Sequence, residues 1–366
     1  MKRRILSLLL VACMAIGLCA CGSDKKGEKT AQTEGKGEDN VIGINPEWAE
    51  TTVFYEIFVR SFADSNGDGI GDFKGIEENL DYLKELGIGA IWLMPMMEST
   101  TYHGYDVVDY YAPNPDYGTM EEFDSLVNAC HEKGIKVIID FVVNHTSSSN
   151  AWFKEALADE SSKYREFYSI ADKIPVEEKD STYSSWRQDE ETGMYYYAHY
   201  DKIMPDLNYN KQAVRDEIKN VAKFWLEHGV DGFRLDGSKE IDADIKVTLS
   251  WWTEFTNFVA DINKEAFIVG ENWTTEYAEV GRYYEAMPSS FNFIAADAIL
   301  SMSKGQYIDI VDQMNKMRER YTSKVESTDV NAIMIDSVMI GNHDMDRVGE
   351  VLEHDEEKIK LYLWLN

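Results

Sequence analysis

Residues 136–145 read Lys-Val-Ile-Ile-Asp-Phe-Val-Val-Asn-His, an apolar and β-branched run that ends in polar side chains. A short apolar run with polar residues at its end predicts a buried β-strand. Comparable runs lie on both sides of it, and together they predict seven strands. The predicted strands are residues 53–60, 90–95, 136–143, 231–236, 267–271, 290–294 and 332–340.

Amphipathic segments separate these runs and predict helices. In residues 211–228, for example, Val214, Ile218, Val221, Phe224 and Trp225 recur at helical spacing, so they would form one buried stripe. The predicted helices are residues 74–86, 119–133, 211–228, 240–264, 275–286, 303–322 and 347–366.

Strands that alternate with helices predict an α/β fold with a parallel sheet. Seven such units favour a TIM (β/α)8-type barrel, whose chemistry lies at the carboxyl ends of the strands. Residues 144–208 break the alternation and are too long for a plain loop, so they predict a small inserted domain, domain B, after strand three. The sequence ends inside the seventh predicted helix, before an eighth strand, which predicts a catalytic barrel over residues 46–366 that is truncated relative to a complete barrel.

The N-terminal segment is predicted to be a sorting signal rather than part of the fold. Basic residues 2–4 precede an apolar stretch, and the segment ends Leu18-Cys19-Ala20-Cys21. This pattern resembles the bacterial lipoprotein signal, which implies a signal peptide over residues 1–20 and lipidation of Cys21. Residues 21–45 would be the lipidated cysteine and a flexible linker. The expected location is a secreted lipoprotein, held by its lipid on a bacterial membrane and facing outside the cytoplasm.

The charge balance excludes one class of partner. The chain has 36 Lys and Arg against 66 Asp and Glu, a formal net charge of −30. Nucleic-acid binding depends on basic residues that neutralise phosphates, so no nucleic-acid partner is expected.

Polar side chains gather where the predicted strands end. Three carboxylates, Asp236, Glu271 and Asp344, follow three different strands. Burying a carboxylate at the carboxyl end of a strand costs folding free energy unless the carboxylate is paired, so such a residue often has a role in chemistry. Asp236 and Glu271 follow neighbouring strands, which lie about 5 Å apart, close to the spacing of the two carboxyl groups in retaining glycosidases. They are therefore a candidate nucleophile and acid/base pair.

The four segments 140–145, 232–236, 271–273 and 342–344 together resemble the conserved regions of the α-amylase family of glycoside hydrolases, family 13. The resemblance runs from about residue 53 to the end. It implies that Asp236 is the nucleophile, that Glu271 is the general acid/base, and that Asp344 is the third carboxylate, which holds sugar hydroxyls.

The same resemblance implies a set of substrate contacts. Tyr105 would be the aromatic platform under the sugar, and His145 and His343 would bind that sugar. Arg234 would keep Asp236 ionised, and Lys239 would bind the leaving side of the chain. The remaining predicted contact is His103, which either binds substrate or braces its loop, whereas Asp140 and Asn144 are expected to brace the site.

Residues 64–72, Asp-Ser-Asn-Gly-Asp-Gly-Ile-Gly-Asp, place oxygen ligands at alternate positions, as the start of an EF-hand loop does. Gly75 at the twelfth position excludes a full EF-hand. The family resemblance implies a structural calcium ion on this loop. The implied ligands are Asp64, Asn66, Asp68, the carbonyl of Ile70, and Asp72.

The expected activity is cleavage of internal α-1,4 bonds in starch or maltodextrins by a retaining, α-amylase-type enzyme. The segment Tyr102-His103-Gly104-Tyr105 lacks the Asp with which exo-glucosidases of the family grip a chain end, which favours the internal mode. Glu240, however, stands where α-amylases carry a histidine. An α-glucosidase of the oligo-1,6-glucosidase type or a 4-α-glucanotransferase therefore stays open. A surface lipoprotein that binds glycans without cleaving them is the alternative from another class.

Overall fold

The computed structural model describes residues 43–175, 185–309, 311–312, 315–316, 319 and 334–365. The predicted signal peptide, Cys21 and the linker up to residue 42 lie outside the described residues. Ile44 is buried, and the backbone N–H of Asn45 donates to the carbonyl of Lys264 at 2.6 Å, so packing begins before the predicted boundary at residue 46. No helix among the described residues is long and apolar enough to cross a membrane.

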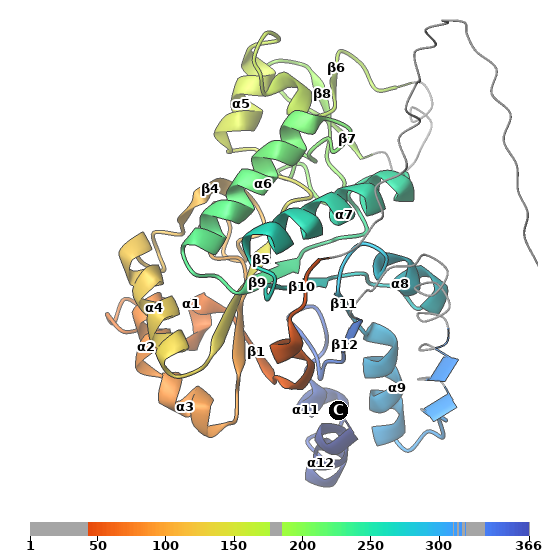
Figure 1. Ribbon diagram of the computed structural model, residues 1–366. Helices are drawn as coiled ribbons and strands as arrows, with labels where there is room; N and C mark the ends of the chain where they lie inside the picture. Colours follow the sequence, from red (N-terminus) through yellow and green to blue (C-terminus); the bar gives the residue numbers. More distant parts are fainter. Residues whose placement is uncertain are drawn as a thin grey trace, which may run out of the picture. The chain divides into compact units, whose positions relative to one another are not determined.

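Seven strands form one sheet, and every adjacent pair is parallel, as the alternating pattern predicted (Figure 1). Their order in the sheet follows their order in the chain, with β1 and β12 as the two outer strands. This is the arrangement of a TIM-type barrel. The strands are β1 (Phe54–Ile57), β2 (Ala90–Leu93), β5 (Lys136–Phe141), β9 (Gly232–Leu235), β10 (Phe267–Gly270), β11 (Ser289–Phe291) and β12 (Ile335–Ser337).

Helices connect these strands and pack on the outside of the sheet. Helix α6 buries Val214, Ile218, Val221 and Trp225 as predicted, whereas Phe224 of the predicted stripe is only partly buried. The helices of the barrel are η1 (Glu47–Thr51), α1 (Val59–Phe62), α2 (Phe73–Glu78), α3 (Leu80–Glu85), α4 (Met120–Glu132), α6 (Gln212–Glu227), α7 (Ile245–Ile262), α8 (Tyr277–Tyr283), α9 (Phe293–Ser303), α11 (Val348–Val351) and α12 (Glu356–Leu365).

Several predicted boundaries were wrong. The helix predicted over 74–86 is two helices that meet at Asn79, and the helix predicted over 347–366 is also divided. The predicted strand 290–294 ends at Phe291, because the Asn292 side chain accepts the backbone N–H of Ala295 and starts α9 there. Helix α9 (Phe293–Ser303) was not predicted. In the helix predicted over 303–322, residues 304–309 are not helical, residues 311, 312, 315, 316 and 319 are helical, and the others from 310 on lie outside the described residues.

The insert predicted over 144–208 is present between β5 and α6. It holds α5 (Ala151–Ala158), η2 (Arg165–Phe167) and an antiparallel sheet of β6 (Ile170–Ala171), β7 (Trp186–Gln188) and β8 (Tyr195–Tyr197). Its two ends are joined by backbone hydrogen bonds from Thr146 to Pro205 and from Leu207 to Asn144. A smaller antiparallel pair, β3 (Met97–Ser99) and β4 (Val107–Pro113), follows β2.

Side chains alternate between the two faces of each barrel strand, and this alternation positions the site. Val137 and Ile139 of β5 join the large outer core beneath the helices. Ile138 joins a second, inner core with Trp92 and Val269. Residues two apart share a face, so polar residues that continue the inward set emerge together at the carboxyl ends of the strands.

Candidate active site

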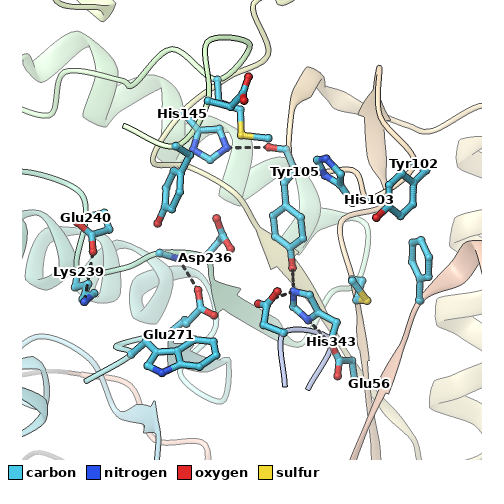
Figure 2. A pocket seen from close by; sticks show the side chains of 18 of the residues that line it. Glu56, Tyr102, His103, Tyr105, His145, Asp236, Lys239, Glu240, Glu271 and His343 are labelled. Carbon is cyan, nitrogen blue, oxygen red and sulfur yellow. Dashed lines mark hydrogen bonds and ion pairs between the residues drawn. The ribbon is translucent and has the colours of Figure 1, made fainter. Parts of the chain in front are cut away.

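A cavity of about 860 Å³ opens at the carboxyl ends of the barrel strands (Figure 2). Most of the predicted site residues line it. These are His103, Tyr105, His145, Asp236, Lys239, Glu271, His343 and Asp344. The structure therefore brings together side chains that are up to 241 positions apart in the sequence, as the strand pattern predicted.

Arg234 lies beneath the cavity and is completely buried. Its Nη1 donates to Asp140 Oδ1 at 2.8 Å and to Asp236 Oδ1 at 2.6 Å, and its Nη2 lies 2.8 Å from Glu271 Oε1. One guanidinium thus pairs with three carboxylates. Two of them belong to the candidate catalytic residues Asp236 and Glu271, which it holds on one side of the barrel interior. Asp140 is buried and is not among the residues that line the cavity, and its bracing role stays a prediction.

Replacing Arg234 with alanine should cost about 3–5 kcal/mol of unfolding free energy, because it leaves three carboxylates without their buried cation. Urea denaturation measures this loss. The matched control is Arg60→Ala, which removes a more exposed partner of Asp116 at 2.9 Å. That change should cost no more than about 1 kcal/mol. Equal losses in the two variants would contradict the role assigned to Arg234.

The Glu271 carboxyl has an environment that favours its protonated form. Burial raises its pKa, Arg234 opposes this shift, and the charge of Asp236 adds to it, with a raised pKa as the net result. The backbone N–H of Gly237 donates to Glu271 Oε2 at 3.0 Å. A carboxyl with a raised pKa, facing a cavity, can donate a proton near neutral pH.

His343 joins several groups on the other side of the cavity. Its Nε2 lies 3.1 Å from Asp344 Oδ2 and 2.7 Å from the Tyr105 hydroxyl, and its Nδ1 lies 2.7 Å from Glu56 Oε1. The rings of Tyr105 and His343 are stacked, with centroids 5.5 Å apart. The hydrogen bond from His343 lowers the pKa of Asp344 against the opposing effect of burial, so this carboxylate is ionised.

His145 differs from His343 in its protonation state. Its Nε2 donates to the Tyr105 carbonyl at 2.9 Å, and burial lowers its pKa to about 4, so the imidazole is neutral at pH 7. His103 Nδ1 accepts the backbone N–H of Tyr105 at 3.1 Å, so this residue braces its loop and also lines the cavity. Lys239 lines the far side and lies 3.5 Å from Glu240.

The loop predicted to bind calcium has a regular pattern of turns. Asp64, Asn66 and Asp68 each accept a backbone N–H from two residues further along the chain. Asp72 accepts the backbone N–H of Gly75 and caps α2. In the part of the chain that the structure describes, no three His, Cys, Asp or Glu side chains converge as a metal cluster. The donors that the loop offers, carboxylate, amide and carbonyl oxygens, are nevertheless those that Ca²⁺ prefers.

Sequence reasoning missed several residues that line the cavity. Glu56 comes from β1, and Tyr200 and Met204 come from the insert. For Glu56 a signal existed, because it is a single carboxylate inside an apolar strand run. The sequence pattern assigns no role to Trp273, but this residue is 44% exposed, and its ring stacks on Phe293 with centroids 4.5 Å apart.

Comparison with known proteins gives consistent matches. Residues 56–365 match the family described as "Alpha amylase, catalytic domain". Alpha-amylase 3 of Dictyoglomus thermophilum is 43% identical over 309 residues, 84% of this chain and 59% of the relative. An oligo-1,6-glucosidase of Heyndrickxia coagulans is 44% identical over 52% of this chain and 36% of its own length. Trehalose synthase and 4-alpha-glucanotransferase are among the names of other relatives.

A solved structure shows the same fold. The crystal structure of alpha-amylase from H. orenii matches with a TM-score of 0.74 and 38% identity, over 86% of this chain and 65% of that one. The chain thus spans about 60% of the length of these two amylases, because the match covers 59% of one and 65% of the other.

Proposed function

The chain belongs to the α-amylase family of glycoside hydrolases, and on this basis we propose that it cleaves internal α-1,4 bonds of starch or maltodextrins with retention of configuration. The observation that carries the proposal is the placement of Asp236 and Glu271 against one buried guanidinium at the floor of an open cavity. Two carboxyl groups so placed, one of them with a raised pKa, suit a double displacement.

In this mechanism Glu271 protonates the oxygen of the leaving sugar while Asp236 attacks the anomeric carbon. The bond from carbon to the leaving oxygen breaks, and a glycosyl ester of Asp236 forms. Glu271, now ionised, then takes a proton from water, and that water breaks the ester. Arg234 donates a hydrogen bond to Asp236 Oδ1 and holds this side chain in place for attack, and Asp344 accepts hydrogen bonds from the hydroxyls of the reacting sugar.

The cavity favours binding in the middle of a chain. Tyr102 and His103 lie on one side of the two carboxyl groups, and Lys239 and Glu240 lie on the other (Figure 2). Tyr102 is 69% exposed, and the aromatic face of Trp273 is also partly free. Exposed aromatic rings suit the apolar faces of pyranose rings. Sugar contacts on both sides of the cleavage point support internal rather than terminal cleavage.

The test is hydrolysis of a maltoheptaoside blocked at its non-reducing end, with the product lengths measured by chromatography. Internal cleavage gives short oligosaccharides despite the block. Release of glucose alone, and only from unblocked substrate, would favour the α-glucosidase alternative. Starch binding without any hydrolysis would favour the glycan-binding alternative.

One observation supports transfer to a sugar acceptor as the second candidate activity. Glu240 lines the leaving side of the cavity between Lys239, at 3.5 Å, and His199, at 3.8 Å. A carboxylate there can accept hydrogen bonds from the hydroxyls of an incoming sugar and hold it in place of water. Products longer than the substrate, rising with acceptor concentration, would identify a 4-α-glucanotransferase.

Calcium on the loop 64–72 is part of the proposal. No ion pair among the described residues involves Asp64, Asp68 or Asp72, so a bound cation would balance the charge of carboxylates that have no cationic partner there. Asp64, Asn66, Asp68, the carbonyl of Ile70, and Asp72 would hold it, and Asp72 also caps α2. The ion would stabilise the loop and take no part in the reaction.

Removal of calcium should therefore lower thermal stability. A ligand at 100 times its Kd stabilises the folded state by about 2.7 kcal/mol, which corresponds to a shift in Tm of about 4 °C for a domain of this size. Calorimetry with and without a chelator measures the shift. Asp68→Asn is the control, because its Tm should respond less to calcium. Identical Tm values for the parent protein with calcium and with chelator would contradict the site.

The proposal also includes lipidation of Cys21 and a location on the outside of a bacterial membrane. The support for it is the basic, apolar and Leu-Cys-Ala-Cys order of residues 2–21. Mass spectrometry of the N-terminal peptide from membranes of a bacterial host tests it. A fatty-acylated peptide that begins at Cys21 is the expected result, and an unmodified thiol at this position would contradict it.

A further inference from the structure

Glu56 is a carboxylate that neither the family motifs nor the proposed mechanism uses. It lies in β1 between Phe54 and Ile57, and its partner in the register of the sheet is Trp92 of β2. Because Trp92 belongs to the inner core, Glu56 faces the interior of the barrel as well. Its side chain is 18% exposed and reaches the floor of the cavity.

The contact between Glu56 and His343 is well formed. Glu56 Oε1 lies 2.7 Å from His343 Nδ1, and the two residues are 287 positions apart in the sequence. At its other nitrogen, His343 reaches both Asp344 Oδ2 and the Tyr105 hydroxyl. The Tyr105 hydroxyl in turn donates to Asp140 Oδ2 at 3.2 Å, so it accepts from His343. Both imidazole nitrogens are therefore donors, which requires the imidazolium form.

We propose that Glu56 is a positioning residue: it fixes the ring and the charge of His343, and through His343 it holds Asp344 and Tyr105 in place for the sugar. The proposal rests on the proposed function for its effect on turnover. Its structural part, the control of His343 by Glu56, stands independently of that function.

The consequence for Asp344 follows from the two nitrogens of the His343 ring. With Glu56 accepting at Nδ1, a neutral imidazole would present a lone pair at Nε2. That lone pair would face the Asp344 carboxylate and repel it. The charged ring instead donates toward Asp344, whose Oδ2 lies 3.1 Å from Nε2. Figure 2 shows the contacts of the same ring with Tyr105 and Glu56. Holding the ring charged therefore holds the third carboxylate.

The groups around His343 come from several elements. Glu56 contributes from β1, Trp92 from β2 with ring centroids 5.9 Å apart, Tyr105 from the segment before β4, and Asp140 from β5. Arg234 lies over the rings of Trp92 and Tyr105 and is the opposing cation. Burial lowers the pKa of His343, but hydrogen bonds to Asp344 and Glu56 and the charge of Asp140 raise it to about 10.

The experiment is an NMR titration of isotope-labelled histidine in the full chain, which has seven histidines. His343→Gln assigns the signal. The variant is Glu56→Gln, which keeps a hydrogen-bond acceptor at Nδ1 and removes only the charge. The matched control is Asp124→Asn, because Asp124 Oδ1 also lies 2.7 Å from a histidine Nδ1, that of His228, outside the cavity.

In the parent protein we expect His343 to titrate well above the ordinary value of about 6.5. Glu56→Gln should lower its pKa by about 1–3 units, the usual effect of losing an opposite charge at contact distance. Asp124→Asn should leave the His343 signal unchanged. Activity of Glu56→Gln on maltosyl fluoride, a substrate that needs no proton from Glu271, should fall as pH rises, beginning at a lower pH than in the parent. Glu56→Asp, which restores the charge, should recover part of the high-pH activity.

Two results would overturn the proposal. One is a pKa of His343 at or below about 6.5 in the parent protein, and this measurement needs no variant. The other is a Glu56→Gln protein whose His343 titration and pH profile equal those of Asp124→Asn. If no preparation hydrolyses maltoheptaose but the His343 titration shifts as expected, then the proposed function fails while the control of His343 by Glu56 holds.

Discussion

Asp236→Asn is expected to lower kcat on maltoheptaose by about 10⁴-fold or more, the scale seen when a covalent nucleophile is removed. Asparagine has the shape of aspartate but cannot form the glycosyl ester. The side chain should still occupy its place, because Arg234 Nη1 can donate to the amide oxygen as it does to Asp236 Oδ1. Substrate binding, measured by calorimetry with the same oligosaccharide, should persist, and the thermal midpoint should change little.

The control for this change is Asp116→Asn, which alters a half-exposed carboxylate that pairs with Arg60 outside the cavity. Its kcat should stay within about twofold of the parent, since most surface substitutions have small effects. Near-parental kcat in the Asp236 variant would remove this residue from the mechanism. A collapse of thermal stability would show that the loss reports unfolding rather than chemistry.

Glu271→Gln should lower kcat on maltoheptaose by about 10²–10⁴-fold, the usual contribution of general acid catalysis. The loss should be much smaller with maltosyl fluoride, because fluoride leaves without a proton. The pH dependence should change as well. The acid must be protonated, and its pKa is raised, so parental kcat/KM is retained below that pKa and lost as pH rises through it. The glutamine variant has no such proton to lose.

The comparison of the two variants assigns the roles. The Asp236 variant should fail on both substrates, whereas the Glu271 variant should fail mainly on the oligosaccharide. The opposite pattern would exchange the nucleophile and the acid. An alkaline limb that survives in the Glu271 variant would mean that another group, such as His343, sets it.

The sequence was sufficient to bring the candidate catalytic residues to one site, because strand geometry is local. A period of two places Arg234 and Asp236 on one face of β9, and the parallel register places Arg234 beside Asp140 of β5. Each of these relations follows from a short apolar run and the polar residues that end it. The same logic could not find the Glu56–His343 contact, because nothing in the strand run around Glu56 indicates which residue lies opposite its side chain across the barrel.

The boundary errors have a local cause too. Residues 289–300 are almost continuously apolar or small. Neither the strand period of about 2 residues nor the helix period of about 3.6 residues therefore distinguishes the end of β11 from the start of α9. The capping side chain of Asn292 makes the distinction in the folded protein. Substrate specificity was harder to predict than the element boundaries. Tyr200 and Met204 reach the cavity from the insert, and the sequence does not specify the path of the insert.

The joined ends of the insert have a consequence for how such proteins diversify. Thr146, Pro205 and Leu207 form a closed neck, from which the chain leaves the barrel and to which it returns at almost the same point. Loops beyond that neck could be lengthened, shortened or exchanged without altering the spacing of β5 and α6, provided that Phe153, Tyr168 and Tyr196 keep their packing in the main core. A graft of another insert at this neck would therefore replace one wall of the cavity while Asp236, Glu271 and their shared Arg234 stay where they are. The barrel keeps the floor of the cavity constant. The neck is the point at which natural variation or protein engineering can change the substrate that the cavity accepts.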